Sequence, residues 1–337
     1  MIFRNIMHLM ITQFLLVKTF RLILLIAAVA TLSFVLVSSS PVDPVDAYVG
    51  AAMLRISPDQ REVIAKRWGL DRPPVERFGR WAGQMATGNF GVSTIFNEPV
   101  LSVIGKRFIT SFWLMALAWS LSGALGFGLG LIAGAREDTL LDRSIRLYAY
   151  TMASTPTFWV GMILLMIFSV SLGWTPVCCA WPPGLSAEQA TLWQRLHHLL
   201  LPAITLSLIG IAQITLHTRE KTIEALRSDY SIFARAQGES TIGIVFRRAL
   251  RNVALPAVTL QFASLGELFG GAVLAEQVFA YPGLGRTTVE AGIRGDIPLL
   301  LGIVLFSTIF VFTGNFMADL IYHLVDPRLR KATGAIS

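Results

Sequence analysis

Six long apolar stretches dominate the sequence and constrain the fold more than any other feature. Each is close to the ~20 residues that an α-helix needs to cross the hydrocarbon core of a membrane. They cover Arg21–Ser38, Ile109–Ala135, Leu147–Leu172, Leu201–His217, Pro256–Phe279 and Ile297–Leu324. Hydrophobic residues make up 54% of the chain and charged residues only 15%, against about 25% charged in a soluble domain. The sequence therefore predicts an all-α polytopic membrane protein with about six transmembrane helices.

Positive charge is distributed unevenly between these spans and sets the expected orientation. Of the 28 Lys and Arg residues, 16 lie in the N-terminal segment, in the loops after the second and fourth spans, and in the C-terminal tail. The two short loops on the other side hold only Arg195, Arg286 and Arg294. Basic loops stay in the cytoplasm, so both termini are expected there. The net charge of +7 follows from this topology and does not indicate a nucleic-acid partner.

The first span has an alternative interpretation as a cleaved signal peptide. Its apolar run is longer than usual for such a peptide, and it follows Arg4, Lys18 and Arg21. No A-x-A-like cleavage site comes after it. An uncleaved anchor is therefore expected.

A charged segment over residues 219–256 separates the fourth and fifth spans and has amphipathic patterns of its own. Its first half predicts a helix that ends at Gly238, a residue suited to the positive φ of a helix terminus. One face of that helix would hold Ile223, Leu226, Tyr230 and Phe233. A second helix would place Ile242, Val245, Phe246, Ala249 and Leu250 on one face and Arg247, Arg248 and Arg251 on the other. With Pro256 closing the segment, two short helices hinged at a glycine predict a docking element.

Part of this segment matches a known pattern: Asp229-Tyr230, Ala234-Arg235-Ala236, Gly238, Arg248-Ala249-Leu250-Arg251-Asn252 and Pro256. It resembles the EAA loop of binding-protein-dependent ABC importer permeases, in the variant of the dipeptide, oligopeptide and nickel permease family. The resemblance implies a coupling helix that seats in a groove of a cytoplasmic ATPase. The coupling residues would be Asp229, Tyr230, Ala234, Arg235, Ala236, Gly238, Arg248, Arg251 and Pro256. From the residues alone, the alternative is an amphipathic hairpin lying on the lipid surface.

The long loop over residues 41–106 is the only sizeable soluble part. A capping-box arrangement that starts at Ser57 predicts a helix up to Leu70. Trp68-Gly69-Leu70-Asp71 and Gly88-Asn89-Phe90-Gly91-Val92-Ser93 resemble the family's G-L-D and G-D-L-G-x-S signatures, with Asn89 in place of the usual Asp. The resemblance implies a lid-like element next to a solute-binding protein. The alternative is a plain structured connector.

Glycines recur at four-residue spacing in the second span, at Gly126, Gly130 and Gly134. Small residues at this spacing let helix backbones approach closely in lipid, so we expect them to pack against a neighbouring helix. Gly266 and Gly270 repeat the spacing in the fifth span.

The fifth span is the one that carries polar residues within its apolar sequence. Gln261, Ser264 and Glu267 follow at three-residue steps, and Glu276 lies near the outer end. Because a charge inside a span is costly, we expect a translocation path along Gln261, Ser264, Glu267 and Glu276. Glu267 would meet a cationic part of the solute or pair with a Lys or Arg of a partner subunit. For Glu276, which resembles the first residue of the family's E-x-V-F-x-x-P-G-L-G signature, capping of the Pro-Gly turn is the alternative.

No residue pattern for catalysis or for a cofactor is present. The P-loop G-x-x-x-x-G-K-[ST], H-E-x-x-H and G-x-S-x-G are all absent from the sequence. His197 and His198 are neighbours that point apart on a helix, which disfavours a shared metal. Cys178 and Cys179, the two cysteines, are expected to be free thiols because adjacent residues rarely reach disulfide geometry.

The tail completes the resemblance, which covers the chain from Asp71 to Arg330. Its closing residues are Gly314-Asn315, Asp319, Tyr322 and Asp326-Pro327-Arg328. The family implies a type I ABC importer transmembrane fold with a periplasmic insertion after the first helix. Three parts are expected: a first helix with its outer loop over 1–108, the transmembrane domain over 109–324 with the coupling loop at 219–256, and a cytoplasmic tail over 325–337.

The function implied is that of a permease subunit in a bacterial inner-membrane importer of di- or oligopeptides. Its partners would be a second homologous permease, two cytoplasmic ATPase subunits that use ATP and Mg²⁺, an extracytoplasmic solute-binding protein and membrane lipid, with no cofactor bound by this chain. Nickel or metal-chelate import is the alternative within the family. An ATP-independent secondary carrier is the alternative from another class, although charged residues in several spans or inverted repeats would be expected for it.

Overall fold

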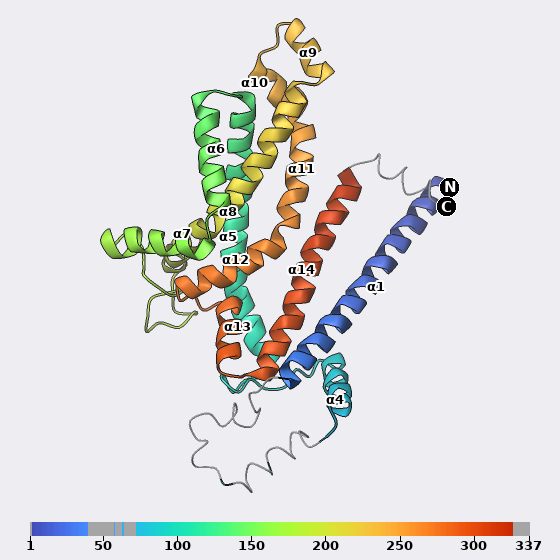
Figure 1. The fold of residues 1–337 in the computed structure, drawn as a ribbon, viewed down its shortest axis with the longest axis vertical. Coiled ribbons are helices and arrows are strands. Elements are labelled where there is room, and N and C mark those ends of the chain that lie inside the picture. Colours follow the sequence, from blue (N-terminus) through green and yellow to red (C-terminus); the bar gives the residue numbers. More distant parts are fainter. Residues whose placement is uncertain (1, 40–56, 58–62, 64–71, 326–337) are drawn as a thin grey trace. The chain divides into compact units, whose positions relative to one another are not determined.

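The computed structural model describes residues 2–39, 57, 63 and 72–325, and the described chain is α-helical without a named strand (Figure 1). The prediction of an all-α protein is confirmed. The α-helices are α1 (Ile2–Ser38), α4 (Pro74–Ala86), α5 (Val100–Ala135), α6 (Leu140–Ala153), α7 (Thr157–Leu164), α8 (Leu192–Leu226), α9 (Asp229–Ala236), α10 (Thr241–Ile244), α11 (Leu250–Ala263), α12 (Leu265–Val278), α13 (Leu284–Ile293) and α14 (Ile297–Val325). Two π-helical segments, η2 (Leu165–Ser171) and η3 (Val245–Ala249), continue α7 and α10.

Helices occupy all six predicted span positions, but not all of them are straight. In the described part, four helices are long and apolar enough to cross a membrane, and the number rises to six if each of two bent pairs is one span. The third position is bent by 108° between α6 and α7. Here Thr155 precedes Pro156, which disfavours helical backbone at Thr155. The fifth position is bent by 50° between α11 and α12, at Ser264.

The chain divides into two compact units, which are described separately. Unit 1 comprises Met1–Phe108 and Thr287–Phe312, and unit 2 comprises Ile109–Arg286 and Thr313–Ser337. In unit 1, helix α4 packs on α1 through rings of Phe34, Phe78 and Trp81 whose centroids lie 5.2–5.9 Å apart. This amphipathic helix is part of the long loop between the first two spans.

In another part of unit 1, the buried carboxylate of Asp296 accepts hydrogen bonds from two segments of the chain. Ser93 Oγ donates to it at 2.5 Å and the Ile95 backbone N–H at 3.1 Å, and the Leu299 N–H donates to its other oxygen at 3.2 Å. Asp296 therefore caps the start of α14 and holds the loop that contains the predicted Gly88–Ser93 signature. Within that loop, Asn89 Oδ1 accepts the Gly91 N–H at 3.1 Å. A carbonyl oxygen is sufficient for this contact, so Asn serves where the family has Asp.

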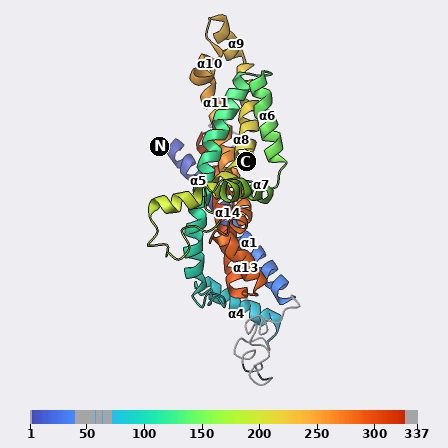
Figure 2. The same ribbon diagram turned by 90° about the vertical axis from the view of Figure 1, so that its left-hand side faces the viewer.

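Helices α5, α6, α8 and α11 run side by side in unit 2, and the hairpin formed by α9, α10 and η3 lies at one end of them (Figures 1 and 2). The glycine stripe of α5 lies against α8, as predicted. A Cβ at Gly126, Gly130 or Gly134 would come within 2.5–2.8 Å of the Cβ atoms of Ile214, Thr218 and Thr222. The same expectation is wrong for Gly270, which has no atom within 4 Å of a built Cβ. The close approach in α12 is made by its neighbour Gly271, next to Leu206.

Several expectations fall on residues outside the described part. The predicted helix from Ser57 to Leu70, apart from Ser57 and Val63, and the Trp68-Gly69-Leu70-Asp71 signature lie there, as does the tail from Asp326 onward.

Candidate functional site

In the segment over residues 219–256, the sequence predicts one continuous helix up to Gly238, but the structure has two. Helix α8 ends at Leu226, and α9 begins only at Asp229. The hydroxyls of Ser228 and Ser231 both donate to the Ala225 carbonyl, at 2.5 and 2.7 Å. They satisfy a carbonyl that a continuous helix would pair with a backbone N–H. The predicted shared face is therefore wrong, since Leu226 is buried on α8 and Phe233 is 63% exposed on α9.

A small buried core anchors the hairpin to the ends of the long helices. Ala234, Ile244 and Ala249 are fully buried, and they pack with residues of α5, α8 and α11. The core consists of Leu131, Ala225, Leu226, Ala234, Ile244, Val245, Ala249 and Val253. The second predicted face is correct for Val245 and Ala249 but wrong for Ile242 and Phe246, which are exposed. The five-residue step of the π-helix η3 aligns Ile244 with Ala249 and shifts the face.

The outer surface of the hairpin exposes large apolar side chains. Ile232, Phe233, Ile242 and Phe246 are 56–63% exposed, and we call these four residues the tip patch. They lie on the part of unit 2 that projects beyond the long helices (Figure 2). Several large apolar side chains exposed on one short hairpin are typical of a protein or membrane contact. The buried core thus holds the hairpin against the long helices, and the tip patch is on the exposed surface of the hairpin.

The remaining hairpin residues predicted for coupling have distinct positions. Gly238 has a φ of +83°, as expected for a glycine that turns the chain between α9 and α10. Arg248 donates to Glu239 at 2.6 Å across the turn, and the Asn252 amide lies 3.4 Å from the Tyr230 hydroxyl. Exposed positions are taken by Asp229, Arg235, Ala236 and Arg251. Pro256 lies inside α11 and does not close the segment, which corrects the prediction.

A buried ion pair ties the base of the hairpin together. Asp142 at the start of α6 is fully buried, and it accepts hydrogen bonds from Arg219 Nε at 2.6 Å and Arg219 Nη2 at 2.8 Å. Arg146 Nε adds a contact at 3.4 Å. The pair joins α6 to α8 one helical turn from the Gly134–Thr222 contact. Sequence reasoning missed Asp142, since nothing in the local pattern links residues 77 positions apart.

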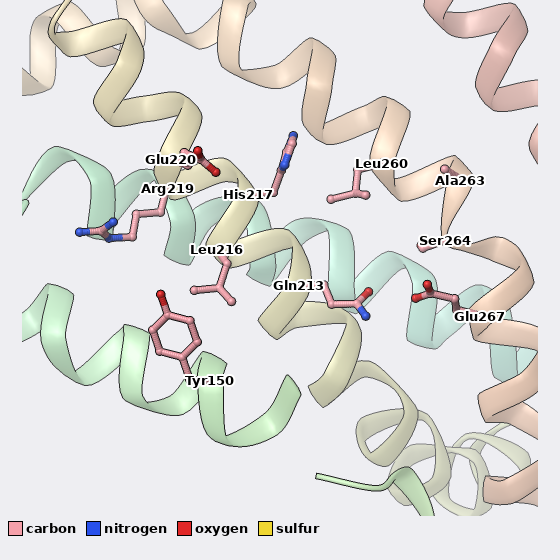
Figure 3. A pocket seen from close by; sticks show the side chains of 10 residues that line it. All are labelled: Tyr150, Gln213, Leu216, His217, Arg219, Glu220, Leu260, Ala263, Ser264 and Glu267. Carbon is pink, nitrogen blue, oxygen red and sulfur yellow. The ribbon is translucent and has the colours of Figure 1, made fainter. Parts of the chain in front are cut away.

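A cavity of about 730 Å³ lies within unit 2, between α6, α8 and the α11–α12 bend (Figure 3). Of the residues predicted for a translocation path, Ser264 and Glu267 line it. Its walls are formed by Tyr150, Gln213, Leu216, His217, Arg219, Glu220, Leu260, Ala263, Ser264 and Glu267. The bend itself is stabilised by Ser264, whose hydroxyl donates to the Gln261 carbonyl at 3.0 Å. The three-residue stripe therefore does not continue along one straight helix.

Gln261 and Glu276 are placed elsewhere, each in a buried hydrogen-bond network. The Gln261 amide donates to the Trp119 carbonyl at 2.6 Å, and Trp119 Nε1 donates to the Gln261 carbonyl at 2.9 Å. Gln261 thereby joins α11 to α5. Glu276 has no exposed surface, and its two oxygens accept from Ser111 Oγ at 2.5 Å and the Arg286 N–H at 2.9 Å. Glu276 thus holds the turn that follows α12 against α5.

Replacing Glu276 with alanine is expected to destabilise the protein strongly. The Arg286 N–H and the Ser111 hydroxyl would lose their buried acceptor, at a cost of about 2–4 kcal/mol. Glu276→Gln is expected to lose less than half as much, since one amide oxygen still accepts from Arg286 while the NH₂ group can donate to Ser111. Thermal unfolding of the purified protein in detergent measures both. Equal stability of Glu276→Ala and the unsubstituted protein would contradict this role.

The two cysteines form a disulfide between neighbours, which corrects the expectation of free thiols. Cys179 adopts a positive φ of 76°, and its N–H donates to the Phe279 carbonyl at 3.0 Å. On the other side, His198 Nδ1 lies 2.9 Å from the Cys178 carbonyl. These hydrogen bonds hold a tight turn in which the two neighbouring cysteines are bonded to each other. The prediction did not consider a backbone with a positive φ at Cys179.

Thiol labelling tests this assignment directly. A maleimide is expected to modify neither cysteine of the denatured, unreduced protein and both of them after reduction, because the chain has only these two cysteines. Mass spectrometry of the peptide that contains Cys178 and Cys179 distinguishes the two states. A labelled peptide before reduction would show that the thiols are free.

Comparisons with known proteins agree with the resemblance found in the sequence. Residues 126–331 match the family described as binding-protein-dependent transport system inner membrane component. The chain is 32% identical to the oligopeptide transport system permease protein AppB of Bacillus subtilis, over 93% of this chain and 97% of that protein. It is 36% identical to the di/tripeptide transport system permease protein DppB of Pseudomonas aeruginosa, over 90% and 94%. A putative peptide permease protein of Brucella suis is 34% identical, over 91% and 95%.

Proposed function

The chain belongs to the family of binding-protein-dependent transport system inner membrane components, and on that premise we propose that it is the permease subunit of an ATP-driven peptide importer. It is a multi-pass membrane protein with the type I ABC importer transmembrane fold. The relatives named above are peptide permeases, and none of their names points to a nickel or metal-chelate solute. Di- and oligopeptides are therefore the solutes proposed.

The surface of the hairpin supports the proposal that partner subunits hydrolyse ATP. Its buried core holds α9 and α10 rigidly, while the tip patch and several arginines remain exposed. An apolar patch on a rigid support can seat in a groove of a cytoplasmic ATPase and transmit its movement. Gly238 would set the angle between the two helices, and Arg248 would stabilise the turn through Glu239. Asp229, Tyr230, Arg235 and Arg251 would form the polar rim, with the small Ala236 among them.

The translocation path is proposed to run along the cavity of unit 2. Ser264 and Glu267 supply its polar groups on the α11–α12 side. Gln261 and Glu276 would act indirectly, since each is buried and holds one of these helices against α5. The bend at Ser264 gives the path a point at which the two halves of the fifth span can move separately.

The proposal divides the chain into three parts and assigns partners to them. Residues 1–108 would form the first helix and an outer region next to a solute-binding protein, 109–324 the transmembrane domain, and 325–337 a cytoplasmic tail. The distribution of Lys and Arg supports a topology with both termini and the hairpin in the cytoplasm. A second homologous permease would complete the path. The tip patch then faces the compartment that contains ATP.

Purification of the tagged chain under gentle detergent tests the proposal. We expect two ATPase subunits and a second permease to co-purify, and the reconstituted complex to take up peptides only with ATP and the binding protein. Peptide uptake without ATP would favour a secondary carrier. Isolation of the chain alone, with no ATPase bound at any salt concentration, would overturn the proposal.

A further inference from the structure

The cavity of unit 2 carries an unbalanced negative charge. Two carboxylates, Glu220 and Glu267, line it, and neither has a salt-bridge partner within the described part of the chain. Arg219 is the only Lys or Arg among the lining residues, and its guanidinium is bound by both oxygens of Asp142. Lys221, the next residue to Glu220, is paired with Glu224 at 2.7 Å. The two basic residues next to Glu220 in the sequence, Arg219 and Lys221, are therefore each already paired with another carboxylate.

The two carboxylates come from different helices and lie at opposite ends of the cavity (Figure 3). Glu220 is on α8, three residues after His217, so the two side chains share a face of that helix. Glu267 is in the first turn of α12, three residues after Ser264. The carboxylates thus do not form one cluster but mark the ends of a polar passage. Sequence analysis identified Glu267 alone, because Glu220 lies in the charged segment where acidic residues are unremarkable.

Both carboxylates are exposed and remain accessible to a ligand. Ionisable groups in such positions typically face a water-filled cavity and mark the path of a solute. A cavity of this size is within the range of ~300–1,000 Å³ that suits small ligands. Carboxylates bind ammonium and guanidinium groups through short, charge-assisted hydrogen bonds. Ser264 and Gln213 can add neutral hydrogen bonds beside them.

We propose that this cavity is a cation-selective subsite, in which Glu220 and Glu267 receive the ammonium or guanidinium groups of the transported peptide. The inference rests on the proposed function and adds to it a preference for basic over neutral and acidic peptides. That preference would operate in the membrane, after the binding protein has released the solute. A negative passage also repels each additional carboxylate of a peptide, so acidic peptides would cross most slowly.

The test uses the complete complex in proteoliposomes and a matched set of tripeptides. Ala-Lys-Ala, Ala-Gln-Ala, Ala-Glu-Ala and N-acetylated Ala-Gln-Ala are each supplied with enough peptide to saturate the binding protein, so that its own preference does not enter. The measured quantity is the ratio of uptake rates. We expect Glu220→Gln/Glu267→Gln to lower the Lys-to-Gln ratio roughly fivefold, the effect of about 1 kcal/mol. The control Glu188→Gln removes an exposed carboxylate outside the cavity and should leave the ratio unchanged.

Charge reversal provides a second variant that does not depend on loss of function. Glu267 is exposed, so Glu267→Lys is expected to fold and to raise the uptake of Ala-Glu-Ala relative to Ala-Lys-Ala. The acetylated peptide identifies the source of the cation. If acetylation slows the unsubstituted complex but not the double variant, the carboxylates receive the terminal ammonium. If replacing Lys by Gln in the peptide slows the unsubstituted complex but not the double variant, and acetylation has no such effect, the carboxylates receive the basic side chain.

Two results would overturn the inference while leaving the proposed function intact. One is a Lys-to-Gln ratio and an effect of acetylation that are both unchanged in the two variants. The other is an equal loss of uptake for all peptides, which would indicate that the carboxylates pair with a cation of the second permease. Failure of the unsubstituted complex to take up any peptide would instead refute the proposed function, and the inference with it.

Discussion

Replacement of Gly130 by alanine is expected to destabilise the membrane domain through a collision between α5 and α8. A Cβ at this position would lie 2.5 Å from Thr218 Cβ and 2.8 Å from the Thr215 carbonyl oxygen. Both are close to the backbone of α8 and cannot move aside by a side-chain rotation. The two helices would have to separate, and overpacking of this kind costs about 1–3 kcal/mol. The temperature at which half of the purified protein unfolds measures the loss.

Gly128 supplies the matched control on the same helix. A Cβ there meets no atom within 4 Å, so Gly128→Ala adds the same methyl group without a collision. Both substitutions gain about 1 kcal/mol of helix propensity, and the difference between them isolates the contact with α8. We expect Gly128→Ala to be as stable as the unsubstituted protein or slightly more stable. Equal unfolding temperatures for the two variants would show that α5 and α8 do not pack as closely as described.

The glycine stripe could be predicted from the sequence because its spacing alone determines which side of the helix is flat. The positions of the six spans were accessible for the same reason, since they depend on length and apolar composition. The bend at Thr155–Pro156 also had a local signal, because a proline follows Thr155. The angle of the bend had no such signal in the sequence. At Ser264 no such signal exists, because the bend depends on a hydroxyl that bonds to the Gln261 carbonyl.

Contacts between distant residues account for most of what sequence reasoning missed. Nothing in the charged segment over residues 219–256 indicates a partner for Arg219, whose guanidinium is bound by Asp142 on another helix. That pairing decides the charge of the cavity, since an unpaired Arg219 would neutralise Glu220 or Glu267. Similarly, the exposed side of the hairpin depends on the five-residue step of the π-helix η3, and a pattern based on the α-helical period of about 3.6 residues does not predict that step. Both features follow from tertiary packing, which the local pattern does not record.

Replacement of Phe233 by alanine is expected to detach the ATPase without unfolding the permease. Phe233 is 63% exposed, while its neighbour Ala234 carries the packing of α9 on the core. The substitution therefore removes apolar surface from the tip patch and leaves the support intact. Large aromatic side chains at the centre of an interface often contribute ~2 kcal/mol or more, which corresponds to roughly 30-fold weaker binding. Co-purification of the ATPase at a series of dilutions measures this change.

Trp193 is the appropriate control, because it is also a largely exposed aromatic residue and lies at the opposite end of α8 from the hairpin. It is 76% exposed, and Trp193→Ala should retain the ATPase fully. The comparison also decides between the two interpretations of the hairpin. If the tip patch lies on lipid, Phe233→Ala would weaken membrane contact but leave ATPase binding and ATP-driven uptake unchanged. If it seats in an ATPase, the variant should lose uptake in proportion to the bound ATPase, and excess ATPase subunit should restore both.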